Sequence, residues 1–238
     1  KEVVNIISQD PVLTGNVLRM ANSSYYRTAN KSIEGIQQAV ILLGEEGLRT
    51  LMSATIMQPV FSISEGAFEG FSKSYWSQAL LSAEAAKRFA KTSRECDSFS
   101  AHFYSLLGSI GYTVLLRLVL EQSKQDREAP LSTALLVRVF ETQLIPLTAL
   151  IAKDWELGPD IELALKETQQ GMDLDKMGGL SRALYYGRLV GTAALLVARG
   201  QWQAPQALAL FAAKGLSPAM SSALWTQVLA LAKQEGKR

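Results

Sequence analysis

Few side chains in this sequence have the chemistry of a catalytic or metal site. Among 238 residues there is one histidine, His102, and one cysteine, Cys96. A zinc or di-iron centre normally needs several histidine or cysteine ligands, which these two residues cannot supply. A Ser-His-Asp or Cys-His nucleophilic arrangement would have to use His102 as its base. No GxSxG motif and no glycine-rich phosphate loop is present. We therefore expect His102 to be a surface or hydrogen-bonded polar residue and Cys96 to be an unreactive thiol near a loop.

Carboxylates alone could in principle bind Mg²⁺, but their distribution favours a structural role. The acidic residues are dispersed along the chain. The pair Glu45-Glu46 stands at the predicted start of a helix, where solvated carboxylates interact favourably with the helix dipole. We expect no metal and no cofactor.

The composition is that of a globular protein and gives little support for a charged partner. Hydrophobic residues make up 48% and charged residues 19%, and the formal net charge is +2 with scattered basic residues. We therefore expect no nucleic-acid partner and no membrane association. A single cysteine excludes a disulfide within the chain. The first ten residues lack the apolar core of a signal peptide, and no apolar stretch approaches roughly 18 residues, so we expect a soluble cytoplasmic protein. Because the chain begins within an apolar helical pattern, we also expect an upstream part.

Start and stop signals for helices recur along the whole chain, and alternation typical of strands is absent. The pattern predicts an all-α domain of about ten helices packed ridge into groove. The segments 62–71 and 171–179 are predicted to be the longest loops. The predicted helices start at Pro11, Ser32 (ending at Gly44), Glu45 (ending at Met57), near Ser74, at Asp97 or Ser98, at Pro146, at Pro159 (ending at Gly171), at Leu180 (ending at Arg199), at Pro205 and at Pro218.

One predicted helix contains an unusual small pair within the stretch SLLGSIGY, residues 105–112. Apolar residues at spacings of three and four place Leu106, Leu107 and Ile110 on one face of this helix. Gly108 and Ser109 interrupt the other side. Glycine in a helix interior costs roughly 1 kcal/mol relative to alanine, so the pair calls for an explanation.

A helix-turn-helix motif is a weak alternative for residues 37–52, QQAVILLGEEGLRTLM. An apolar segment, a turn with glycine and a second helix have approximately the right spacing. The predicted recognition helix, however, offers Glu45, Glu46 and only Arg49. Carboxylates at its start would face DNA phosphates unfavourably, so we favour other functions.

The first sixty or so residues closely resemble the opening of the HDOD domain, the HD-related output domain of bacterial signalling proteins. The resemblance lies in DPVLTGNVLRMANSSYY, residues 10–26, and in SIEGIQQAVILLGEEGLRTL, residues 32–51. It continues more weakly through Trp76, through SLLGSIG and through Trp155 and Leu157, and it covers most of the chain. It implies an HDOD-type domain over residues 1–200, with residues 201–238 as a helical extension packed on the same domain.

The resemblance also suggests what the small pair replaces. HDOD domains are similar to HD phosphohydrolases, in which a His-Asp pair and further histidines hold metal. In related sequences, His and Asp stand where this chain has Gly108 and Ser109. Other ligand positions fall near Gln78, near Leu144 and near Glu167 or Thr168. Glycine and leucine cannot ligate a cation, and an isolated serine or glutamine binds one poorly. The resemblance thus implies a conserved scaffold with a degenerate metal site.

We therefore expect a non-enzymatic signal-transduction module that binds a protein partner or relays the state of a fused sensor or receiver domain. The alternative is a degenerate, metal-dependent HD phosphohydrolase acting on a nucleotide or phosphoester. Two interpretations remain open for the corner after the first full helix, either a structural helix stop or an exposed docking surface that uses tyrosine and arginine. The residues of this candidate surface are Asn22, Ser23, Tyr25, Tyr26 and Arg27. Trp202 and Trp225 could be core anchors or part of a partner surface, and core is favoured.

Overall fold

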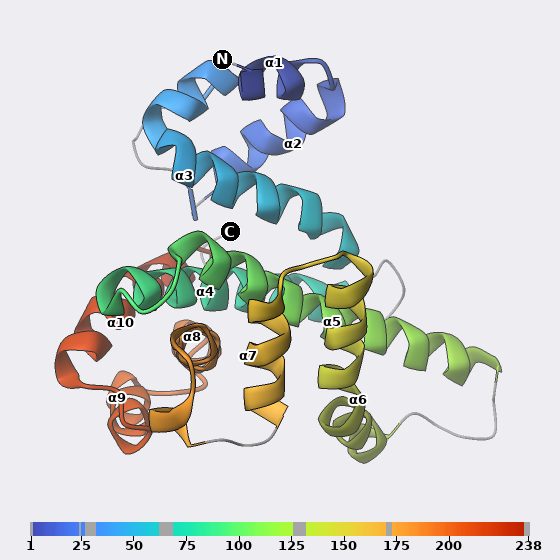
Figure 1. The fold of residues 1–238 in the computed structure, drawn as a ribbon, viewed down its shortest axis with the longest axis vertical. Coiled ribbons are helices and arrows are strands. Elements are labelled where there is room, and N and C mark those ends of the chain that lie inside the picture. Colours follow the sequence, from blue (N-terminus) through green and yellow to red (C-terminus); the bar gives the residue numbers. More distant parts are fainter. Residues whose placement is uncertain are drawn as a thin grey trace.

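The computed structural model describes residues 2–23, 25–26, 32–61, 69–125, 132–169 and 173–235, and these residues form helices without any strand (Figure 1). The predicted all-α fold of about ten helices is therefore confirmed. The α-helices are α1 (Glu2–Ser8), α2 (Pro11–Ala21), α3 (Ile36–Met57), α4 (Glu69–Ser93), α5 (Ser98–Gln125), α6 (Thr133–Asp154), α7 (Pro159–Gln169), α8 (Gly179–Ala198), α9 (Ala204–Ala213) and α10 (Pro218–Glu235). Short 3-10 segments lie at Gln58–Phe61 (η1) and Leu174–Lys176 (η3).

Local capping explains several helix starts that the sequence predicts. Asp10 accepts hydrogen bonds from the backbone N–H of Val12 at 2.8 Å and of Leu13 at 3.0 Å, which caps α2. The Asp97 carboxylate accepts a bond from the backbone N–H of Ser100 at 2.7 Å at the start of α5. Prolines occupy the first positions of α2, α7 and α10.

Three predicted helix starts are wrong, namely those at Ser32, at Pro146 and near Ser74. Ser32 does not cap α3, because Ile33 is held by hydrogen bonds to the Asn22 side chain and the helix begins only after Gly35. The predicted break at Gly44 is confirmed, because its non-helical φ of +68° and ψ of −179° separate two helical segments at a kink within the range labelled α3. Pro146 lies inside α6 instead of starting a helix. Helix α4 begins at residue 69, before the predicted start, and residues 62–68 of the predicted loop lie outside the described residues.

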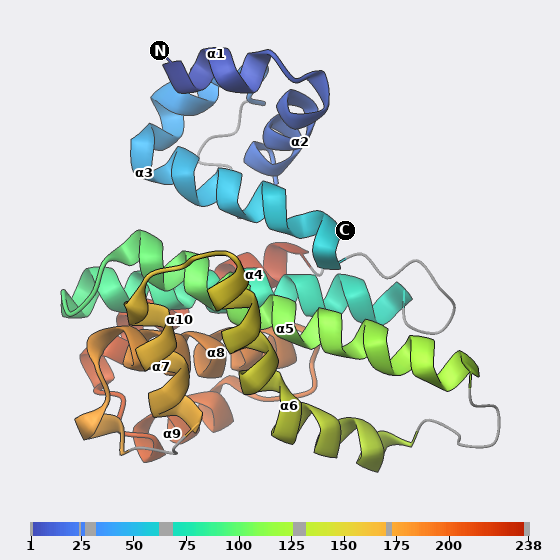
Figure 2. The same ribbon diagram turned by 45° about the vertical axis from the view of Figure 1, so that its right-hand side comes forward.

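Helices α4 and α8 pack side by side at the centre of the molecule, and α5, α6, α7, α9 and α10 surround them (Figure 2). Close approach is possible because Gly187 and Gly191 of α8 face α4. A Cβ at Gly187 would lie 2.7 Å from both the Ala86 Cβ and the Ser82 carbonyl oxygen. Helices α1 to α3 form a separate layer over α4 and α5 (Figures 1 and 2).

Buried apolar side chains form two clusters that share α4. The first joins α1–α3 to α4, α5, α6 and α7, with Leu80 and Leu107 among its members. The second joins α4 to α8, α9 and α10, with Phe89, Phe211 and Trp225 among its members. Helices α9 and α10 thus pack on the same body as the rest of the chain.

Two helices are long and apolar enough, by length and composition, to cross a membrane, which corrects the expectation that no stretch approaches that length. In α5, the stretch 98–122 contains an 18-residue window with a mean hydropathy of 1.6, and half of this window is buried, as in a core helix. In α6, the stretch 134–154 contains an 18-residue window with the same mean hydropathy, but only 6% of it is buried. Helix α6 exposes Leu135, Val137 and Leu150.

Candidate functional site

The polar side chains at the predicted metal positions are engaged in hydrogen bonds within the fold. Gln78 of α4 donates through Nε2 to Ser82 Oγ and to Thr192 Oγ1 of α8, both at 3.0 Å. The Ser109 hydroxyl donates to the Ser105 carbonyl oxygen at 3.1 Å, one turn back in α5. These bonds tie Gln78 to α8 and Ser109 to its own helix.

The other predicted metal positions hold a leucine, a glycine, and a glutamate whose carboxylate is already hydrogen-bonded within the fold. Leu144 is buried in α6 on the side that faces α5, and Gly108 has open space where a side chain would stand. Glu167 is buried and accepts bonds from the Gly178 backbone N–H at 2.9 Å and from the Ser181 hydroxyl, which links α7 to the start of α8. Thr168 lies in α7, and its side chain is outside the described residues.

These residues do not fit the metal that the HD resemblance implies. In the part of the chain that the structure describes, no three or more histidine, cysteine, aspartate or glutamate side chains come together as a cation site. An amide, a hydroxyl and an isobutyl group do not replace imidazole and carboxylate ligands. The arrangement supports helix packing rather than metal chemistry.

His102 is buried, with only 1% of its surface exposed, so it is not a surface residue, and only the hydrogen-bonded alternative of the prediction fits. Its Nε2 lies 3.5 Å from the Tyr26 hydroxyl, at the limit of a hydrogen bond, and its buried Nδ1 has no partner among the residues that the structure describes. Burial, followed by the nearby Lys87 cation, lowers the pKa of His102 to about 3. The imidazole is therefore neutral at physiological pH. It projects from α5 and packs against the corner after α2.

The corner after α2 contains buried residues, which counts against its interpretation as an exposed docking surface. Tyr26 is 8% exposed and belongs to the core. The Asn22 amide donates to the carbonyl oxygens of Leu18 at 2.9 Å and Ile33 at 2.8 Å and accepts from the Ile33 backbone N–H at 2.8 Å. These bonds favour the structural interpretation of Asn22. Ser23 and Tyr25 are half-buried, and Arg27 lies outside the described residues.

The helix-turn-helix alternative places its recognition residues against the body of the protein. Glu46 accepts bonds from Lys91 at 2.9 Å and from the Ser98 hydroxyl at 2.8 Å, and the bond to Lys91 is the main reason why the pKa of Glu46 is lowered. The Arg49 guanidinium lies 4.2 Å from the centre of the Phe99 ring. The second half of α3 is therefore occupied by contacts to α4 and α5.

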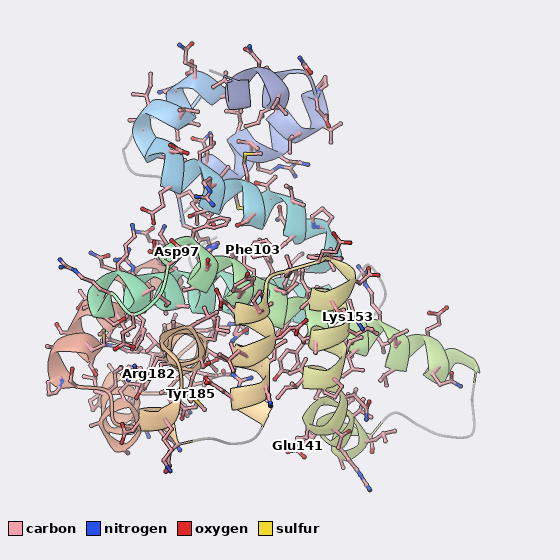
Figure 3. All side chains as sticks on the ribbon, in the orientation of Figure 1. Asp97, Phe103, Glu141, Lys153, Arg182 and Tyr185 are labelled. Atoms are coloured by element: carbon pink, nitrogen blue, oxygen red, sulfur yellow. The ribbon has the colours of Figure 1, made fainter. Side chains whose placement is uncertain are left out.

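The remaining predicted residues have structural surroundings. Cys96 is half-buried in the turn between α4 and α5, and burial raises the pKa of its thiol to about 11, so the thiol stays protonated. Trp225 is buried and packs edge-to-face on Phe211 at a ring-centre distance of 5.4 Å. Trp202 is half-buried and lines a cavity of about 250 Å³ on α8 that the sequence did not predict. The sequence does contain a pattern that could have indicated this cavity. Tyr185, Arg188 and Thr192 are spaced three and four residues apart, which places them on one face of α8 (Tyr185 is labelled in Figure 3).

Comparison with known proteins gives the family. A crystal structure of an HDOD domain protein of unknown function from Geobacter sulfurreducens has 22% identity and a TM-score of 0.57 over 82% of this chain and 65% of that one. This chain thus spans just under two thirds of the length of that protein.

A second crystal structure, of a "putative metal-dependent phosphohydrolase" from Shewanella amazonensis, has 19% identity and a TM-score of 0.64 over 98% of this chain and 84% of that one. At these identities the likeness shows the fold alone. No curated protein matches the chain. The family model of the HDOD domain matches residues 1–170, and the chain therefore belongs to the HDOD domain family.

Proposed function

We propose that this chain is a non-enzymatic signal-transduction module of the bacterial cytoplasm, which binds a protein partner or relays the state of a fused sensor or receiver domain. One observation carries the proposal. The positions at which the resemblance implies metal ligands hold Gln78, Gly108, Ser109 and Leu144, together with Glu167 or Thr168. Of their described polar side chains, Gln78, Ser109 and Glu167 are hydrogen-bonded within the fold. An HD-type reaction needs a metal to polarise the phosphoryl group and to activate water, and one carboxylate that is already hydrogen-bonded does not make such a site.

A relay needs two packings of the same helices that differ in affinity for a partner. The junction between the α1–α3 layer and the body contains contacts that such a change could exchange. The Glu46–Lys91 ion pair is exposed, and the Arg49–Phe99 contact crosses the same junction. Exposed ion pairs contribute little to stability, typically about 0–1 kcal/mol, so breaking this one costs little.

The second candidate is a metal-dependent phosphohydrolase acting on a nucleotide or phosphoester, favoured by the description of the Shewanella amazonensis protein. Elemental analysis of protein purified without chelator separates the two candidates. We expect no stoichiometric Fe, Mn or Zn, and no release of phosphate from nucleotides after these metals are added. Stoichiometric metal together with metal-dependent hydrolysis would establish the second candidate instead.

The relay is tested by hydrogen exchange in a protein that carries this chain together with the proposed fused sensor or receiver domain. Amides of α3 to α5 at the junction should change protection between the two states of the fused domain, whereas those of the central α4–α8 contact should not. Identical protection at the junction in both states would count against a relay through these helices.

A further inference from the structure

A cavity of about 250 Å³ opens on the face of α8 that α9 and the turn before α9 border. Its walls are mostly apolar, with Leu189 from α8, Leu210 from α9 and the Trp202 ring. A dry engineered cavity of about 150 Å³ accepts benzene, so this cavity has room for one aromatic ring with a short substituent. Neither His102 nor Tyr26 lines it.

The polar groups in the wall are hydrogen-bond donors. Thr192 accepts a bond from Gln78, and among the described residues its own hydroxyl donates no hydrogen bond. Arg188 stands one turn earlier on the same face of α8 and is exposed at the mouth. Its guanidinium reaches the Tyr112 hydroxyl at 3.4 Å and forms no ion pair with any described residue.

Among the described residues no carboxylate lines the cavity, and within this part of the chain Arg188 is a positive charge without an ion-pair partner beside an apolar space. A guanidinium pairs well with a carboxylate, because it offers two parallel N–H donors to the two oxygens. The Thr192 hydroxyl, held in place by Gln78, is a further donor within the same wall. An apolar interior with an anion-binding mouth is the arrangement expected for a small amphipathic acid.

We propose that this cavity binds a small aromatic carboxylate, with its ring against Trp202 and the leucines and its carboxylate at Arg188 and Thr192. Gln78, at a position where the resemblance implies a metal ligand, acts here as a positioning residue for Thr192. The inference goes beyond the proposed function, because ligand binding can be measured whether or not the chain binds a protein.

The test uses 4-phenylbutanoate and its uncharged analogue 4-phenylbutanol, titrated calorimetrically into the chain. The acid should bind more tightly than the alcohol. Arg188→Gln should weaken binding of the acid by at least about tenfold, as expected for loss of a charge-assisted hydrogen bond, and should change binding of the alcohol by less than about twofold. Arg199→Gln, at the end of the same helix and away from the cavity wall, is the matched control and should change neither.

Occupancy of the cavity is tested separately. Leu210→Trp fills the space and should abolish binding of both compounds. In the unaltered chain, the indole N–H signal of Trp202, assigned with Trp202→Phe, should shift on addition of 4-phenylbutanoate. This measurement decides the question even if Leu210→Trp fails to fold. No binding of the acid, equal affinity for acid and alcohol, or an unmoved Trp202 signal would each overturn the proposal.

Discussion

At the scale of single residues, burial decides what His102 can do. A lone histidine near the start of a helix gave no local reason to expect burial, because its neighbours in sequence do not enclose it. Tyr26, whose hydroxyl contacts the imidazole, lies 76 residues away in the sequence. Helix caps such as Asp10 and Asp97 could be predicted because they depend on residues two or three positions away. The burial of Tyr26 and the pairing of Glu46 with Lys91 depend on long-range packing, which a local pattern does not contain.

The neutral state of His102 gives a prediction about pH. Its pKa of about 3 in the folded chain lies below the ordinary value of 6.5, so the folded state binds fewer protons than the unfolded state between these pH values. The stabilisation from a neutral His102 is present above pH 6.5 and is lost as the pH falls towards 3, by at most about 1.4 kcal/mol for each pH unit.

Because the chain has one histidine, a single imidazole signal can be followed by NMR. We expect this signal not to titrate between pH 5 and 8 in the folded protein. In His102→Leu, the free energy of unfolding should fall less steeply below pH 6.5 than in the unaltered chain. A titration midpoint near 6.5 would show that solvent reaches the imidazole.

At the scale of helices, local sequence signals locate most helices, but they do not decide whether a helix continues through a glycine or a proline. Gly44 and Pro146 are both ordinary helix breakers by sequence, but only Gly44 interrupts the helical backbone, whereas α6 continues through Pro146. Tertiary packing explains the second case, because Leu144 and Thr148 are buried on either side of Pro146.

The two central glycines of α5 should respond oppositely to substitution. A Cβ at Gly108 would meet no atom within 4 Å, so Gly108→Ala should stabilise the protein by roughly 0.5–1 kcal/mol through helix propensity. A Cβ at Gly111 would overlap the Thr148 hydroxyl and lie 3.2 Å from Leu144 Cδ1, so Gly111→Ala should destabilise it by about 1–3 kcal/mol. Packing thus requires a glycine at 111 but not at 108, where the resemblance implies that a larger side chain once stood.

Urea denaturation of the two variants beside the unaltered chain measures both changes. Equal destabilisation by the two substitutions would contradict the packing of α5 against α6.

At the scale of the whole molecule, α4 contributes buried side chains to both apolar clusters. Leu80 and Ala83 of α4 belong to the first cluster, and Leu81 and Phe89 belong to the second. The sequence predicted that residues 201–238 pack on the main domain, but not that α10 would contact α4 and α8 together. That contact places the C-terminal residues in the same core as the central helices.

Loss of a C-terminal core residue should therefore destabilise the whole chain. Trp225 is buried against Phe211, and Trp225→Ala should lower the free energy of unfolding by about 3–5 kcal/mol, a large share of the roughly 5–15 kcal/mol typical of a domain. Leu208→Ala, at a residue 42% exposed on α9, is the control and should change the free energy of unfolding by no more than about 0.5 kcal/mol.

Thermal unfolding of Trp225→Ala is followed by circular dichroism and by the imidazole signal of His102, which reports on the junction with α1–α3. Because α4 belongs to both clusters, the two transitions should coincide, whereas a native His102 signal after helix is lost elsewhere would show that the α9–α10 end unfolds independently.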